Sequence, residues 1–260
     1  MKKVILSVMM LALIVTIVGA ATTGVKKKKP LPHEYGNVVM NNSSELNGIA
    51  PVVFNHWLHR SLYSCRLCHV DLAFAMEANA TGVKEADNKS GYYCGACHNG
   101  KEAFGNVTVS SSGEQIKNCE RCHSYGKKVV FEKDFKKYTA AFPTDRFGNK
   151  IDWVKAETDG KIHLKDFIEG VSIKRKPLAI PEDEEVRAKS KGMPSIVFSH
   201  KKHALWSGCE LCHPDIFGVK KGDTKYSMQD IFNGKFCGAC HDKVAFPNAD
   251  CQKCHTEPVY

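Results

Sequence analysis

Six copies of one short pattern, Cys-x-x-Cys-His, carry most of the chemistry that this sequence can perform, and together they use all 12 cysteines. In a c-type haem site both thiols of such a pattern add to the porphyrin vinyl groups, and the adjacent histidine becomes the proximal iron ligand. The sequence therefore predicts six covalently attached haem c groups. In chain order, motif 1 is Cys65, Cys68 and His69; motif 2 is Cys94, Cys97 and His98; motif 3 is Cys119, Cys122 and His123; motif 4 is Cys209, Cys212 and His213; motif 5 is Cys237, Cys240 and His241; motif 6 is Cys251, Cys254 and His255.

Two other uses of paired cysteines are weaker interpretations. Four-thiolate zinc sites are built from Cys-x-x-Cys units, but zinc does not require a histidine after every second cysteine. A disulfide framework suits an even number of cysteines in an exported chain, but it explains the regular spacing no better.

A second pattern, Phe-x-His-x-x-His, supplies further imidazoles. It places His56 and His59 ahead of motif 1, and His200 and His203 ahead of motif 4. The i, i+3 spacing puts both side chains on one face of a helical turn. Two imidazoles in that position could serve two irons.

Both patterns recur in the same order in the two halves of the chain, which indicates an internal duplication. Val53-Phe54 before motif 1 matches Val197-Phe198 before motif 4, and motifs 2 and 5 both read Cys-Gly-Ala-Cys-His. We expect a signal peptide at 1–20, an N-terminal arm at 21–50, triheme module 1 at 51–126, a connector at 127–193 and triheme module 2 at 194–260.

The first twenty residues resemble a secretory signal. Lys2 and Lys3 precede an apolar run from Val4 to Val18, and Ala20 offers a cleavage site. An uncleaved membrane anchor is the alternative, because the run approaches the length that spans a bilayer. No later segment is long enough to cross a membrane, so we expect no transmembrane span after cleavage. The expected location is the periplasm, with an extracellular or membrane-tethered protein as alternatives.

The basic charge balance does not point to nucleic acid. The formal net charge is +9, and part of that surplus leaves with the two lysines of the signal. Each haem brings two propionates, so six haems would take the mature protein to about −5, a sign that argues against a polyanionic partner.

The expected fold is mainly α-helix and coil with little regular secondary structure. Each module has too few residues to enclose three haems in a side-chain core, so the porphyrins should form the core. The connector has no cysteine but is rich in aromatic residues, and a structureless segment of that length is unusual. We expect it to pack on the haem modules, with short helices near 131–139 and 182–190.

These motifs resemble those of the small triheme class III cytochromes c of metal- and sulfur-reducing anaerobes. The resemblance covers both modules, as if two such proteins were fused. It implies that the first histidine of each pair, His56 or His200, ligates the haem of motif 1 or motif 4. It also implies that the second, His59 or His203, reaches the haem of motif 2 or motif 5.

The third haem of each module departs from that family pattern. The family takes its sixth ligand from a histidine four residues before the middle motif, where this chain has Ser90 and Asn233. Three possibilities stay open: one of the unassigned histidines, a methionine, which would raise the potential, or an open or water-bound iron. The unassigned side chains are His33, His163, Met76 and Met228.

Function depends on whether any iron is open. An iron with both axial positions filled can only change its oxidation state, which predicts a periplasmic electron relay and no enzyme. Its redox partners would be a quinol-oxidising membrane complex or small cytochromes as donors, and a terminal reductase or an outer-membrane conduit as acceptors. The alternatives are a multihaem reductase with an open haem, and a subunit of an extracellular cytochrome filament.

Overall fold

The computed structural model describes residues 29–124, 131–188 and 192–256. The chain divides into two compact units, Met1–Pro30 and Leu31–Tyr260, and the second contains all six motifs. The predicted signal peptide lies outside the described residues. In the described ranges, no helix has the length and apolar character needed to cross a membrane.

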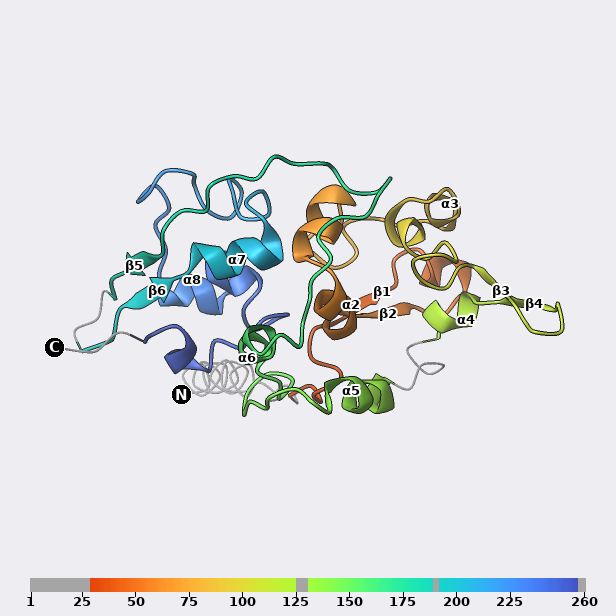
Figure 1. Cartoon of the computed structure of the whole chain (residues 1–260), viewed down its shortest axis with the longest axis horizontal. Helices are drawn as coiled ribbons and strands as arrows, with labels where there is room; N and C mark the ends of the chain where they lie inside the picture. The colour runs from red at the N-terminus through yellow and green to blue at the C-terminus, as the bar shows by residue number, and fades with distance from the viewer. Residues whose placement is uncertain (1–28, 125–130, 189–191, 257–260) are drawn as a thin grey trace, which may run out of the picture. The chain divides into compact units, whose positions relative to one another are not determined.

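The secondary structure is short throughout, which confirms the expected helix-and-coil fold (Figure 1). The α-helices are α2 (His56–Leu62), α3 (Glu85–Lys89), α4 (Cys119–Cys122), α5 (Phe131–Thr139), α6 (Trp153–Thr158), α7 (His200–Ser207) and α8 (Met228–Phe232). Single helical turns form η1 (Glu45–Asn47), η2 (Leu67–Asp71), η3 (Tyr93–Ala96), η4 (Phe236–Ala239) and η5 (Cys251–Lys253). Helical turns carry motifs 1, 2, 3, 5 and 6, whereas motif 4 lies in consecutive turns after α7.

The strands form three separate antiparallel pairs: β1 (Asn37–Met40) with β2 (Val52–Asn55), β3 (Val107–Val109) with β4 (Gln115–Lys117), and β5 (Glu184–Val186) with β6 (Ile196–Phe198). Two of these pairs are equivalent, because β2 leads into α2 and β6 leads into α7. The strand ahead of each histidine pair is therefore fixed by a partner strand from the preceding segment.

The middle motifs repeat the same local structure. Their Gly95 and Gly238 come close to the carbonyl of the preceding helical segment: a Cβ would lie 1.9 Å from Asn88 O and 2.0 Å from Ile231 O. Any side chain would clash there, so Cys-Gly-Ala-Cys-His needs its glycine for packing. Each tight approach fixes motif 2 on α3, or motif 5 on α8.

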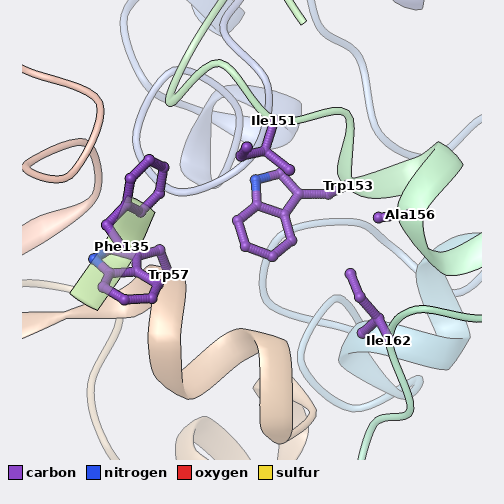
Figure 2. Packing of buried hydrophobic residues seen from close by; sticks show 6 residues of the cluster. All are labelled: Trp57, Phe135, Ile151, Trp153, Ala156 and Ile162. Carbon is purple, nitrogen blue, oxygen red and sulfur yellow. The ribbon is translucent and has the colours of Figure 1, made fainter. Parts of the chain in front are cut away.

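A side-chain cluster joins the connector to α2, so the expectation of a core made of porphyrins was incomplete (Figure 2). Trp57 is 1% exposed, and its ring meets Phe135 of α5 edge-on with ring centres 5.1 Å apart. Trp153 and Ala156 of α6 are buried in the same cluster. The hydrophobic effect therefore holds the connector against module 1.

The connector contains α5, α6 and β5, and one of its two predicted helices is correct. Helix α5 matches the prediction for 131–139. The helix predicted for 182–190 is wrong, because Glu184–Val186 forms β5 and pairs with β6. The prediction missed α6, which begins where Asp152 Oδ1 accepts a hydrogen bond from Lys155 N at 3.1 Å.

Candidate haem-binding sites

The phenylalanine of each Phe-x-His-x-x-His pattern orients both imidazoles. Phe54 meets the His56 ring edge-on at 4.8 Å between centres and lies 4.3 Å from the His59 ring centre. Phe198 repeats this contact with His200 at 4.9 Å and with His203 at 4.3 Å. Each phenylalanine lies in the strand before the histidine pair, and the helix that follows presents both histidines on one face.

Three pairs of imidazoles face each other at the separation that two axial ligands of one iron require. The ring centres of His56 and His69 are 6.4 Å apart and the rings are inclined by only 9°. The ring centres of His59 and His98 are also 6.4 Å apart, with the rings inclined by 52°. Each metal–imidazole bond is about 2.0 Å long, so two ligands on opposite sides of a metal have ring centres roughly 6 Å apart.

The third of these pairs lies in module 2, where the ring centres of His203 and His241 are 6.3 Å apart and the rings are inclined by 61°. These are the pairs that the family resemblance names as ligands for motifs 1, 2 and 5. No equivalent facing is described for His200 and His213 of motif 4, within the residues that the structure covers.

All ten histidines of the two patterns direct Nδ1 at a backbone carbonyl oxygen, at 2.6–3.1 Å. A carbonyl oxygen only accepts, so each Nδ1 must carry the proton and Nε2 keeps its lone pair for a metal. The acceptors are the carbonyls of Gly36 for His56, Asn55 for His59, Phe74 for His69, Phe104 for His98, Ala50 for His123, Glu182 for His200, Ser199 for His203, Phe217 for His213, Phe246 for His241 and Pro194 for His255.

Burial adjusts the protonation of these side chains toward ligation. Desolvation lowers the pKa of His56, His59 and His241 to about 4, so these imidazoles are neutral at physiological pH. Desolvation also raises the pKa of the Cys68 thiol to about 12 and that of the Cys94 thiol to about 11.

The described chain offers little to the two alternative uses of the cysteines. All twelve cysteines lie in described ranges, and no disulfide joins any two of them there. No group of three or more His, Cys, Asp or Glu side chains that could hold a metal ion is found in those ranges. The imidazole pairs and their fixed Nδ1 protons instead fit an iron in a porphyrin.

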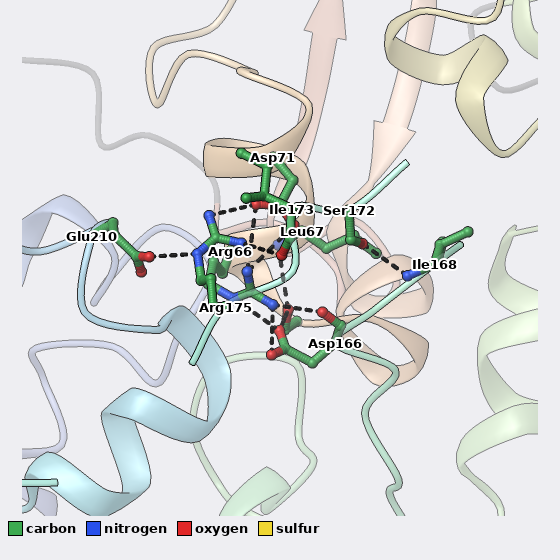
Figure 3. A network of polar contacts seen from close by, with 10 residues as sticks. Arg66, Leu67, Asp71, Asp166, Ile168, Ser172, Ile173, Arg175 and Glu210 are labelled. Carbon is green, nitrogen blue, oxygen red and sulfur yellow. Dashed lines mark hydrogen bonds and ion pairs between the residues drawn. The ribbon is translucent and has the colours of Figure 1, made fainter. Parts of the chain in front are cut away.

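A charge cluster of Arg66, Asp71, Asp166, Arg175 and Glu210 links motif 1, the connector and motif 4 (Figure 3). Arg66 contacts Asp166 at 2.6 Å and Asp71 at 3.3 Å. Arg175 contacts Asp71 at 2.6 Å and Glu210 at 2.5 Å. Arg66 and Glu210 follow the first cysteine of equivalent motifs, so residues of opposite charge connect the two modules at their first haem sites.

Arg60, the residue after the second paired histidine of module 1, makes a second link. Its guanidinium carbon lies 5.1 Å from the Trp153 ring centre and 4.9 Å from that of Trp206, an arrangement typical of cation–π contacts. Its Nη1 donates to the carbonyl oxygen of Val244, just beyond motif 5. Sequence reasoning missed Arg60, although an arginine beside a ligand was a visible signal.

The structure assigns no sixth ligand to motifs 3 and 6. In the described part of the chain, no imidazole faces His123 or His255, and no hydrogen bond or ring contact brings His33 or His163 to them. The two methionines named as alternatives are exposed, Met76 by 44% and Met228 by 42%.

Comparison with known proteins agrees with these observations. The repeated attachment motifs and paired imidazoles define the class, a multihaem c-type cytochrome of electron transport. The sequence profile of cytochrome c7 and related cytochrome c matches residues 52–124 and 196–256. Because the match covers more than half of the chain, the protein belongs to this family and carries covalently bound haem c. No curated protein matched.

Solved multihaem cytochromes are also similar to this chain. A c7-type three-heme cytochrome domain is 39% identical, with 31% of this chain and 99% of that domain covered and a TM-score of 0.28. The C-terminal hexaheme fragment of a dodecaheme cytochrome c is 26% identical, with coverage of 88% and 99% and a TM-score of 0.27. The N-terminal hexaheme fragment is 27% identical, with coverage of 85% and 98% and a TM-score of 0.25.

Proposed function

We propose that this cytochrome carries six haems in two triheme modules and relays electrons between redox proteins outside the cytoplasm. The observation that carries the proposal is the facing of imidazoles at 6.3–6.4 Å in three pairs. An iron held between two such imidazoles has no open position for a substrate, so its chemistry is the gain and loss of one electron.

The residues in each role follow from the motifs. The cysteines of motifs 1 to 6 attach the haems, and the histidine of each motif is the proximal ligand. The distal ligands are His56 for motif 1, His59 for motif 2, His200 for motif 4 and His203 for motif 5. Each pair serves two neighbouring haems from one helical turn, which keeps the irons close enough for electrons to hop between them.

The proposed partners are proteins. A quinol-oxidising membrane complex or a small cytochrome would supply electrons, and a terminal reductase or an outer-membrane conduit would accept them. The pattern of a secretory signal in residues 1–20 supports a periplasmic setting, because c-type haem is attached outside the cytoplasm.

A reductase acting at motif 3 or motif 6 is the second candidate. It is favoured by one observation: in the described residues no imidazole faces His123 or His255. Such an enzyme would bind a small oxidant at a high-spin iron.

Two measurements on the oxidised holoprotein separate these functions. Pyridine haemochrome absorbance against protein mass should give six haems per chain, and four or fewer would refute the assignment of motifs. Resonance Raman or room-temperature magnetic circular dichroism should find low-spin iron at motifs 1, 2, 4 and 5. A high-spin haem that turns over nitrite or hydroxylamine many times per second would replace the relay with the reductase.

A further inference from the structure

Motifs 3 and 6 are equivalent sites with the same backbone contacts. Nδ1 of His123 donates to Ala50 O at 3.0 Å, and Nδ1 of His255 donates to Pro194 O at 2.6 Å. Each histidine also forms a backbone bridge to the strand before the paired histidines, at Val52 in one module and at Ile196 in the other. A difference between the two haems must therefore come from the side chains around them.

The residue before the first cysteine differs in charge. Asn118 precedes motif 3 and is 8% exposed, whereas Asp250 precedes motif 6 and is 7% exposed. The Asn118 amide donates to Gly105 O at 2.8 Å and to Thr108 Oγ1 at 2.6 Å. A neutral amide and a carboxylate thus occupy equivalent buried positions beside equivalent haem sites.

The residue before the second cysteine is basic in both motifs, but its surroundings differ. Lys253 of motif 6 lies 3.1 Å from Asp145 and 3.0 Å from Asp152 of the connector, so two carboxylates outweigh its charge. Arg121 of motif 3 instead stacks on Phe104, with its guanidinium carbon 3.6 Å from the ring centre. Motif 3 also carries Glu120 where motif 6 has Gln252, and Arg146 lines the same pocket as Asp145, Asp152 and Asp250. With these side chains counted, Arg121 and Glu120 cancel at motif 3, whereas three carboxylates stand against Lys253 and Arg146 at motif 6. The local charge is therefore more negative at motif 6 by one unit.

We propose that Asp250, together with Asp145 and Asp152, lowers the reduction potential of the haem at motif 6 below that of the haem at motif 3. Negative charge stabilises ferric over ferrous iron, since the ferric form carries one more positive charge. An electron delivered to motif 6 then passes on through the chain, leaving that haem ferric and the haem of motif 3 ferrous. This gives a direction to the relay proposed above, on which it rests, from module 2 toward module 1.

The test exchanges the two side chains in the full-length holoprotein. Asp250→Asn removes the carboxylate at motif 6, and Asn118→Asp introduces one at motif 3. A potentiometric titration followed by NMR of the haem methyl signals resolves single haems. Glu45→Gln, an exposed site in the arm, is the control and should change nothing.

Asp250→Asn should raise the ferrous-to-ferric ratio of the motif 6 haem about tenfold at a fixed potential, the order expected for one partly buried charge. Asn118→Asp should lower the ratio at motif 3 by a similar factor. A tenfold change is about 59 mV for a one-electron couple. Changes below twofold in both variants, or changes in the same direction, would overturn the proposal.

Haem content by mass and the low-spin absorption bands check that each variant has assembled. If Asp250→Asn loses its haem, Asp145→Asn removes one carboxylate from Lys253 and should shift the motif 6 haem in the same direction by a smaller factor. No shift there would also count against the proposal. The titration measures potentials in the isolated protein, so it can be read even if a catalytic high-spin haem were to refute the relay.

Discussion

Replacing Trp57 with alanine should remove roughly 4 kcal/mol from the free energy of unfolding. Trp57 is 1% exposed, and a buried aromatic side chain hides about 150–250 Å². At about 25 cal/mol per Å² this burial contributes roughly 4–6 kcal/mol, an upper bound because the denatured chain already hides part of it. Tryptophan-to-alanine changes in cores cost about 3–5 kcal/mol, which sets the expected value.

Trp57→Phe is the matched control, because it keeps a ring in contact with Phe135. It should cost about 1–2 kcal/mol for the smaller buried area. Guanidinium denaturation of the holoprotein measures both variants, followed by far-ultraviolet circular dichroism and by the low-spin haem bands. Because Trp57 stands between His56 and His59, ligand loss at motifs 1 and 2 should shift to lower denaturant. A Trp57→Ala variant within 1 kcal/mol of wild type would show that the cluster does not support the ligand helix.

Three further outcomes are expected. His203→Ala should leave the motif 5 haem high-spin in resonance Raman while motif 4 keeps its ligand, and an unchanged spectrum would mean that another group ligates that iron. Arg66→Met should lower stability by about 1 kcal/mol, because the Asp166 side chain is 53% exposed and Asp71 keeps Arg175 as a partner. Thermal unfolding identical to wild type would exclude a role for the charge cluster. Potentiometry should place the haems with two imidazole ligands at low potentials, and finding every haem well above zero would contradict bis-histidine ligation.

The ligand pairs were predictable from sequence because their geometry is local. A strand that ends at Asn55 and a helix that begins at His56 place two imidazoles on one face, and both elements are encoded within a few residues. The Nδ1 acceptors were not predictable in the same way. The carbonyls of Gly36 and Glu182 belong to the backbone, so no residue type marks them, and both depend on strand pairing with a distant segment.

The error at 182–190 has the same origin. Glutamate favours helices in isolation, which made the acidic run after Pro181 look helical. Pairing of Glu184–Val186 with β6 overrides that weak preference. The aromatic cluster was predicted only in part. The connector's apolar residues indicated that it packs on a module, but the sequence did not identify Trp57 as the residue that they bury.

Helices α2 and α7, which carry the two histidine pairs, are not interchangeable. Trp57 and Leu58 of α2 align with Lys201 and Lys202 of α7, and the first pair is covered by the connector while both lysines are exposed. Transplanting α7 into the place of α2 would carry two ammonium groups into an aromatic cluster and would remove Arg60 from between its tryptophans. A chain cut into halves would likewise expose that cluster. The two copies have diverged: the connector covers α2, whereas the equivalent positions of α7 are exposed. Neither half of the chain is therefore expected to behave as a smaller version of the whole.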